Sequence, residues 1–300
     1  MEGETRLVAV DEAGRWGATT LPERLLLIDM ETRTVAWDTP LEGAAWTALD
    51  LSTPGNLAAV GDESGRVFVV LSTTGDELFN FRPHSETVTA LRFSPDGRML
   101  ATGSIAGAVR IWVLRNQSLR GELPAELGAV WQLEWDPALR GVYFLKDDRA
   151  LHAMPFETFM AEPIARLEPG DAMTFASEAG SASLLLLDRG GAVRFAEGET
   201  LLEGGACKAA ALLRQSASSR WLAVVCDDGP LRVWDRTARH VYTADRKVRD
   251  LRFVDERGNR LELVPGGLNW APGPIDSGEA AEVDAARQRK APPPVEAEAP

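Results

Sequence analysis

The 300-residue sequence lacks the features that build membrane spans and secretory signals. Its longest apolar runs, such as residues 184–187, are far too short to cross a bilayer. The N-terminus is acidic and has neither the basic nor the apolar region of a signal peptide. We therefore expect a soluble, cytoplasmic protein.

Cysteine is also scarce, since Cys207 and Cys226 are the only two. Two cysteines do not make a disulfide framework. If the hairpin between them turns at Ser218 and Ser219, the residue opposite Cys226 is Ala211, four positions from Cys207. We therefore expect two reduced thiols, with Cys226 buried as a small apolar residue.

Basic residues are outnumbered, because 32 Lys and Arg stand against 45 Asp and Glu, a formal net charge of −13. A general nucleic-acid binder, or a protein of anionic membrane surfaces, needs an excess of Lys and Arg to neutralise phosphates. The composition argues against both classes and leaves room for a small basic patch. We expect no nucleic-acid partner and no membrane insertion.

What the sequence does contain is a repeated pattern of short strands and tight turns. Residues 84–112 read HSETVTALRFSPDGRMLATGSIAGAVRIW, with Pro and Gly at the corners of two successive hairpins. Weaker copies recur about every 41 residues, a spacing typical of repeat architectures. The third strand of each copy marks seven units, at residues 26–29, 68–70, 110–112, 151–153, 193–195, 232–235 and 268–270.

Most units contain four predicted strands, and no segment before about residue 276 shows a sustained apolar period of 3.6 residues. A four-stranded sheet cannot bury both of its faces alone, so the sheets must stack on one another in a ring. The sequence therefore predicts an all-β fold, a seven-bladed β-propeller of four-stranded antiparallel sheets whose last blade is incomplete.

Two units resemble the WD40-repeat family, and the resemblance extends over about residues 5–270. The matching structural residues are His84, Asp96, Gly97, Ser104 and Trp112 in unit three, and Asp228, Trp234 and Asp235 in unit six. In family members a His, a Ser or Thr, a turn Asp and the Trp often form a buried hydrogen-bonded network across one blade. Unit three has Ala106 in place of the turn Asp, and unit six has Cys226 in place of the Ser or Thr. The resemblance therefore implies a divergent member.

The sequence divides into a propeller over residues 1–271 and a disordered, Pro/Ala/Glu-rich tail over residues 272–300. Unit seven then lacks an outer strand, and three readings are open. The tail around Ile275 folds back as a poor strand, residues 6–10 are a donated strand, or the edge is open and short. An open edge invites pairing by another chain, although a covering loop or tail is the simpler arrangement.

No motif indicates catalysis. His84, His152 and His240 fall in three different units and have no metal-ligand spacing. CxxC, HExxH, GxSxG and P-loop patterns are absent. We predict no catalytic residue, no metal site and no cofactor, and we expect that the protein is not an enzyme.

The candidate binding residues lie in the loops between second and third strands, on the face where the resemblance implies peptide binding. We single out Asp62, Glu63, Asp147, Asp148, Asp227 and Asp228, together with Trp46 and Trp131 at the starts of first strands. The acids would favour a protein partner or peptide with a basic surface, and the aromatics would anchor it. Simple solubility for the acids, and packing between blades for the tryptophans, are the alternatives.

The leading hypothesis is a non-catalytic protein–protein interaction scaffold or a subunit of a multiprotein complex. It would bind partners through the loop face, the edge of unit seven or the tail. The alternative is a propeller with a small-ligand or enzymatic site at the mouth of its central channel.

Overall fold

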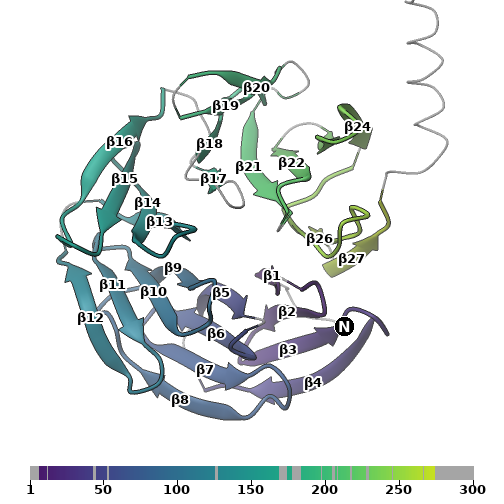
Figure 1. Ribbon diagram of the computed structural model, residues 1–300. Helices are drawn as coiled ribbons and strands as arrows, with labels where there is room; N and C mark the ends of the chain where they lie inside the picture. The colour runs from purple at the N-terminus through teal and green to yellow at the C-terminus, as the bar shows by residue number, and fades with distance from the viewer. Residues whose placement is uncertain are drawn as a thin grey trace, which may run out of the picture.

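The computed structural model describes residues 7–273, except residues 12, 43–44, 53, 126–127, 169–173, 178–183, 197, 205–206, 208, 217, 228–229, 245 and 266. The described residues form seven antiparallel sheets arranged in a ring (Figure 1). Each sheet is one blade, and its strands follow one another from the centre of the ring to the rim. The predicted all-β, seven-bladed propeller is confirmed.

The strands of the blades are as follows. Blade one has β1 (Val8–Val10), β2 (Trp16–Leu21), β3 (Arg24–Asp29) and β4 (Thr34–Pro40), and blade two has β5 (Trp46–Ser52), β6 (Leu57–Asp62), β7 (Val67–Leu71) and β8 (Glu77–Phe81). Blade three has β9 (Val88–Phe93), β10 (Met99–Ser104), β11 (Val109–Val113) and β12 (Ser118–Leu123), and blade four has β13 (Val130–Trp135), β14 (Gly141–Lys146), β15 (Ala150–Pro155) and β16 (Glu162–Arg166). Blade five has β17 (Phe175–Ser177), β18 (Leu184–Leu187), β19 (Val193–Phe195) and β20 (Thr200–Leu202), and blade six has β21 (Ala210–Gln215), β22 (Trp221–Cys226), β23 (Leu231–Asp235) and β24 (His240–Ala244). Blade seven has β25 (Asp250–Phe253), β26 (Arg260–Val264) and β27 (Gly267–Ala271).

The turn residues noted in the sequence close the hairpins. Between β9 and β10 the backbone N–H of Gly97 donates to the carbonyl oxygen of Ser94 at 2.8 Å, with a φ of 68° at Gly97. A Cβ at Gly97 would lie 2.5 Å from the backbone nitrogen of Gly55 in the neighbouring blade. Glycine is required here both by the left-handed backbone and by the close approach of two blades.

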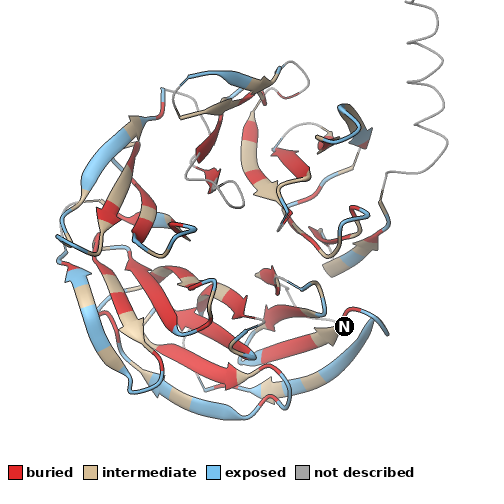
Figure 2. Cartoon of the chain, viewed as in Figure 1, coloured by how far each residue is buried: buried red, intermediate tan, exposed pale blue. Residues whose placement is uncertain are grey.

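The apolar core lies between the blades rather than inside any one of them. Each of seven clusters of buried apolar side chains takes its members from two neighbouring blades. Inner strands are mostly buried and the outermost strands are mostly exposed (Figure 2). Stacking of blades therefore supplies the hydrophobic stabilisation that a single sheet cannot.

The ring closes through packing between blades one and seven. Val8 and Met30 of blade one form a small buried cluster with Leu261 and Leu263 of blade seven. Strand β1 pairs with β2 of its own blade, so the reading of residues 6–10 as a strand donated to blade seven is wrong. Within the described residues blade seven has three strands, as predicted. Ile275 and the tail lie outside the described residues.

The expectation of two reduced thiols is wrong, because Cys207 and Cys226 form a disulfide with their Cα atoms 5.6 Å apart. The assumed hairpin register holds from Leu212 to Gln215 and changes by one residue only at Cys226. A bulge at Ala211 lets Ala210, rather than Ala211, pair with Cys226. The chain just before β21 passes close to the end of β22, and both cysteines lie in the apolar cluster between blades five and six.

None of the described residues belongs to a helix long and apolar enough to cross a membrane.

Candidate functional site

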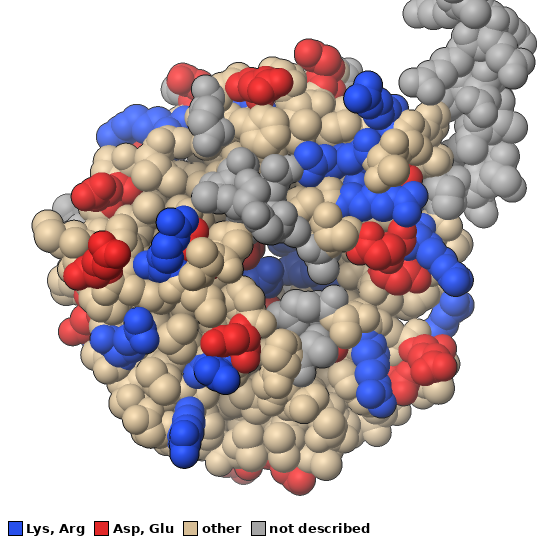
Figure 3. Space-filling view, in the orientation of Figure 1, with Lys and Arg blue, Asp and Glu red and all other residues tan. Residues whose placement is uncertain are grey.

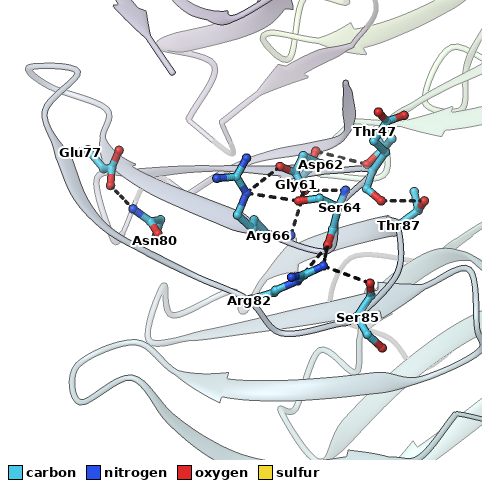
Figure 4. A network of polar contacts seen from close by, with 11 residues as sticks. Thr47, Gly61, Asp62, Ser64, Arg66, Glu77, Asn80, Arg82, Ser85 and Thr87 are labelled. Atoms are coloured by element: carbon cyan, nitrogen blue, oxygen red, sulfur yellow. Dashed lines mark hydrogen bonds and ion pairs between the residues drawn. The ribbon is translucent and has the colours of Figure 1, made fainter. Parts of the chain in front are cut away.

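One face of the ring, here called the loop face, is formed by the turns that join second to third strands. Asp62 lies at the first of the predicted positions and its side chain is fully buried. Its Oδ1 accepts hydrogen bonds from the backbone N–H groups of Ser64 and Arg66, both at 2.9 Å, and from the Ser64 hydroxyl at 2.8 Å (Figure 4). Its Oδ2 pairs with Arg66 Nε at 3.2 Å. Asp62 therefore holds the turn together and has little carboxylate surface left for a partner.

The other described acids are exposed, and two of them are also anchored by hydrogen bonds. Asp147 Oδ2 accepts the backbone N–H of Ala129 at 2.9 Å, and Asp148 Oδ2 lies 3.0 Å from His152 Nε2. Glu63 and Asp227 are exposed, and their backbone N–H groups donate to the carbonyl oxygens of Ala45 and Ala209. Asp228 lies outside the described residues. The partner-binding role of these acids stays a prediction.

The two predicted tryptophans occupy different environments. Trp46 is 5% exposed and packs edge-on against Phe68, with ring centroids 5.5 Å apart. Its ring belongs to the core between blades one and two, as in the packing alternative. Trp131, in contrast, is 48% exposed, and its indole N–H donates to Asp147 Oδ1.

Trp131 stands at a position that has a structural task in other blades. In blades two and three the bulged second residue of the first strand is a threonine. The Thr47 hydroxyl donates to the carbonyl oxygen of Val88, and the Thr89 hydroxyl donates to that of Val130, each in the next blade. In blade four Gln132 takes over this connection, since its Nε2 donates to the carbonyl oxygen of Phe175 at 2.6 Å. The bulged residue is thereby released for an exposed aromatic ring.

The structural repeat residues are found in the blades, with a changed partner for the histidine. His84 Nε2 lies 2.8 Å from Thr102 Oγ1, not from Ser104, whose hydroxyl accepts the N–H of Ala108. Burial, helped by the charge of Arg110, lowers the pKa of His84 to about 4, so the ring is neutral at pH 7. The indole N–H of Trp112 has no hydrogen-bond partner among the described residues. The four-residue network is reduced to one histidine–threonine contact.

The other repeat residues stabilise turns. Asp96 Oδ1 accepts the Ser94 hydroxyl at 2.6 Å. Asp235 pairs with Arg220 Nη2 at 2.7 Å and accepts the backbone N–H groups of residues 237 and 238. Trp234 is half-buried at the edge of the cluster between blades five and six. Burial alone would raise the pKa of Asp235, but the Arg220 and backbone hydrogen bonds outweigh it and lower that pKa.

The centre of the ring contains a feature that the sequence did not reveal. A cavity of about 1150 Å³ is lined by the first strands of all seven blades. Figure 3 shows the ring hollowed at its centre, with basic side chains inside the hollow. A belt of six charged residues lines this channel: Asp50, Arg92, Glu134, Arg214, Asp250 and Arg252.

The charges of this channel belt are paired with one another. Arg92 bridges two blades, with its Nη1 3.0 Å from Asp50 Oδ1 and its Nε 3.1 Å from Glu134 Oε2. Asp250 Oδ1 lies 2.8 Å from Arg214 Nε and 2.7 Å from Arg252 Nη1. Burial lowers the pKa of Arg252 to about 10, and the charge of Arg214 acts in the same direction.

The sequence signal for the channel belt is a shared register. Asp50, Arg92, Glu134 and Arg214 are each the fifth residue of a first strand. Aligning the first strands would have shown alternating charges at one height of the channel. No group of three or more potential metal ligands occurs among the described residues.

Comparison with known proteins gives one family match and several partial relatives. Residues 75–113 match the family described as WD domain, G-beta repeat. This repeat starts just before the outer strand of blade two and ends on the third strand of blade three, so one sequence repeat links two neighbouring blades.

Three relatives illustrate the similarity. DNA damage-binding protein 2 of Danio rerio is 32% identical over 114 residues, covering 37% of this chain and 22% of that protein. Echinoderm microtubule-associated protein-like 4 of Homo sapiens is 29% identical over 136 residues, covering 41% and 14%. Mediator of RNA polymerase II transcription subunit 16 of Drosophila melanogaster is 27% identical over 154 residues, covering 46% and 19%. The chain thus spans less than a quarter of the length of each of these relatives. Taken together, the match over residues 75–113, the seven-bladed ring and the partial relatives support a member of the WD40-repeat family.

Proposed function

We propose that this protein is a non-catalytic interaction scaffold that binds a protein partner through the loop face, with Trp131 as the central anchor. The observation that carries the proposal is the exposure of Trp131 at a position where two other blades use threonine to join the next blade. Tryptophan is among the residue types that contribute most to protein interfaces.

The surroundings of Trp131 support a preformed binding surface. The hydrogen bond to Asp147 holds the indole ring in one orientation, which lowers the entropy lost on binding. Ile105 lies in the turn between β10 and β11 of blade three, which corresponds to the turn of Asp147 in blade four, and it is 47% exposed on the loop face.

The acids of the loop face define the chemistry of the partner. Glu63, Asp147, Asp148 and Asp227 are exposed in turns of the loop face, and Asp147 lies next to Trp131. A partner segment with an apolar residue flanked by Lys or Arg would match both features. One relative is by name a subunit of Mediator, which supports a role inside a multiprotein complex.

The direct test is affinity capture from the source cell with the wild-type chain and the Trp131→Ala variant. We expect a protein recovered by the wild type to be lost with Trp131→Ala. Met160→Ala is the matched control, because Met160 is 66% exposed and lies on the rim between β15 and β16. Recovery of the same proteins by the wild type and Trp131→Ala would refute the proposal.

A small-ligand site in the central channel has less support. The cavity is large enough, and three arginines line it. Each of these arginines already forms an ion pair with a carboxylate of the channel belt, which favours a role in joining blades.

A further inference from the structure

The disulfide between Cys207 and Cys226 fastens the link between blades five and six. Cys207 lies in the chain between β20 and β21, and Cys226 is the last residue of β22. Both cysteines belong to the apolar cluster between these blades, and they are 9% and 5% exposed. The bond therefore ties the chain that leaves blade five to the second strand of blade six.

Blade five has less strand pairing of its own than its neighbours along the chain. Its described strands contain three or four residues each, whereas the strands of blades two, three and four contain five to seven. Shorter strands form fewer hydrogen bonds within the blade. Contacts with blade six, the disulfide among them, therefore carry a larger share of the attachment of blade five to the ring.

A buried cation without a carboxylate lies beside the disulfide. Arg232, the second residue of β23, is 8% exposed, and its Nη1 and Nη2 donate to the carbonyl oxygens of Gly191 and Glu203, each at 3.1 Å. Burial lowers the pKa of Arg232. Arg110, at the same position of β11, has the Glu122 carboxylate 2.7 Å from its Nε. No acid in the described part of the chain forms such a pair with Arg232.

The guanidinium group and the disulfide meet at the backbone of Gly191. A Cβ added to Gly191 would lie 3.0 Å from Cys207 Sγ and 3.5 Å from Arg232 Nη1. The neutral disulfide makes no use of this positive charge, but a Cys207 thiolate would. Opposite charges attract strongly in a poorly solvated interior, and a neighbouring cation favours the thiolate over the thiol.

A cation that stabilises the thiolate makes a disulfide easier to reduce. Reduction converts the bond into two thiols, and any group that stabilises the reduced form shifts the equilibrium toward it. Structural disulfides without such a group resist reduction by glutathione. Arg232 therefore gives the bond between Cys207 and Cys226 the environment of an exchangeable disulfide.

We infer that the bond between Cys207 and Cys226 is a redox switch that a thiol reductant opens and whose open form Arg232 stabilises. A reductant thiolate attacks Cys226 Sγ, the bond between the two cysteine sulfurs breaks, and Cys207 leaves as a thiolate beside Arg232. A second reductant thiolate attacks the reductant's sulfur in this mixed disulfide and releases Cys226, which takes up a proton. The protein gains two electrons, and two reductant thiols are oxidised to one disulfide.

Opening the bond loosens one sector of the loop face. The N–H of Ala210 donates to the carbonyl oxygen of Arg189 at 3.0 Å, and the N–H of Asp227 donates to that of Ala209 at 2.9 Å. The link between β20 and β21 is thus held between loop-face turns of blades five and six, and after reduction it keeps only such non-covalent contacts. Because both sulfurs are buried, exchange proceeds through local opening of this link. The switch does not depend on a partner at Trp131, which lies in blade four.

The test equilibrates the full chain with mixtures of reduced and oxidised glutathione at pH 8.5, about where an ordinary cysteine thiol titrates. Iodoacetamide then traps the free thiols, which are counted by mass spectrometry. We expect the wild-type bond to be half reduced within the range of these mixtures. Arg232→Gln should need about a tenfold more reducing mixture, a shift of about 30 mV, because an opposite charge this close favours the thiolate by about that factor.

Two further variants separate the charge of Arg232 from its packing. Arg232→Lys keeps the charge and should keep the wild-type midpoint. Arg110→Gln, at the same position of blade three, is the matched control and should leave the midpoint unchanged. A bond that stays oxidised in every mixture would overturn the inference. Equal midpoints for the wild type and Arg232→Gln, or equal midpoints for the Lys and Gln variants, would do so too.

Hydrogen exchange of the wild type tests the local opening without any substitution. Reduction should speed exchange at the amides of Ala210 and Asp227 more than at the amides of β9 and β10. Equal acceleration in both places would mean that the whole ring loosens, and the switch would then not be local.

Discussion

Replacing Asp250 by asparagine should destabilise the ring by about 3 kcal/mol, the lower end of the range for breaking a buried ion pair. The Asp250 carboxylate accepts from Arg214 Nε and Nη2 at 2.8 and 3.1 Å, from Arg252 Nη1 at 2.7 Å and from the Leu251 N–H at 2.8 Å. Asparagine has a similar shape but leaves two arginines facing each other in the channel without a negative charge. We use the lower end because the side chains of Asp250 and Arg214 are each 19% exposed to the channel, where water screens part of the repulsion.

Urea unfolding followed by tryptophan fluorescence measures the effect, since the chain contains nine tryptophans. Asp38→Asn is the matched control, because it removes an ion pair with side chains 52% and 36% exposed and should cost less than about 1 kcal/mol. Adding Arg214→Gln to Asp250→Asn should recover part of the loss, with a coupling energy above about 1 kcal/mol. If Asp250→Asn cost no more than Asp38→Asn, the channel belt would not be what joins blades six and seven.

The pH dependence of this difference has a defined sign. Burial alone would raise the pKa of Asp250, but the charges of Arg214 and Arg252 outweigh it and hold that pKa below its ordinary value of 3.8. Because the folded pKa is depressed, the stabilisation is fully present above pH 3.8 and is lost as the pH falls through the folded pKa. The stability difference between wild type and Asp250→Asn should therefore be constant from pH 5 to 8 and shrink only below about pH 4.

Three further predictions concern stability. Burial lowers the pKa of His84 from 6.5 to about 4. As the pH falls from 6.5 to 4 the unfolded chain binds a proton at this histidine and the folded chain does not, so the free energy of unfolding should fall by up to about 3 kcal/mol. Urea unfolding across this pH range should show the loss in the wild type and not in His84→Gln. Thr89→Val removes a hydrogen bond to the next blade and should cost about 1 kcal/mol, whereas Thr73→Val, at an exposed turn position, should change the unfolding free energy by less than about 0.5 kcal/mol. Reduction of the bond between Cys207 and Cys226, which are 19 residues apart, should lower stability by about 3 kcal/mol; thermal unfolding with and without dithiothreitol tests this, and an unchanged Tm would contradict it.

The fold could be predicted because its information is local and repeated. The turn at residues 94–97 and the apolar third strands recur in every unit, so errors in one unit are corrected by the others. The register of strand pairing within a blade was harder to predict from the sequence. The bulge at Ala211 makes Ala210 the strand partner of Cys226, and the disulfide joins Cys226 to Cys207, three residues earlier and outside β21, where strand register does not apply. Bulges leave no clear trace in a pattern of alternating residues.

The candidate site was predicted only in part, because its contacts join residues that are about one repeat apart. Trp131 was recognised as a candidate anchor from its place at the start of a first strand, but so was the buried Trp46. The two tryptophans differ in exposure because the neighbouring blade packs side chains against Trp46 and not in the same way against Trp131. The ion pairs of Arg92 reach residues 42 positions away on either side, a distance at which hydrophobic periodicity carries no information.

Comparison of blades, position by position, is therefore the most direct way to find function in this ring. A position that joins two blades through threonine at residues 47 and 89 carries an exposed tryptophan at residue 131. A position that is apolar at residues 57 and 99 carries a buried arginine at residue 260, within the one sheet that has three described strands. Both departures leave a side chain that the ring itself does not fully use. In a repeat protein, where stability requires only that each blade pack on its neighbours, such departures are the places to look for selection by a partner.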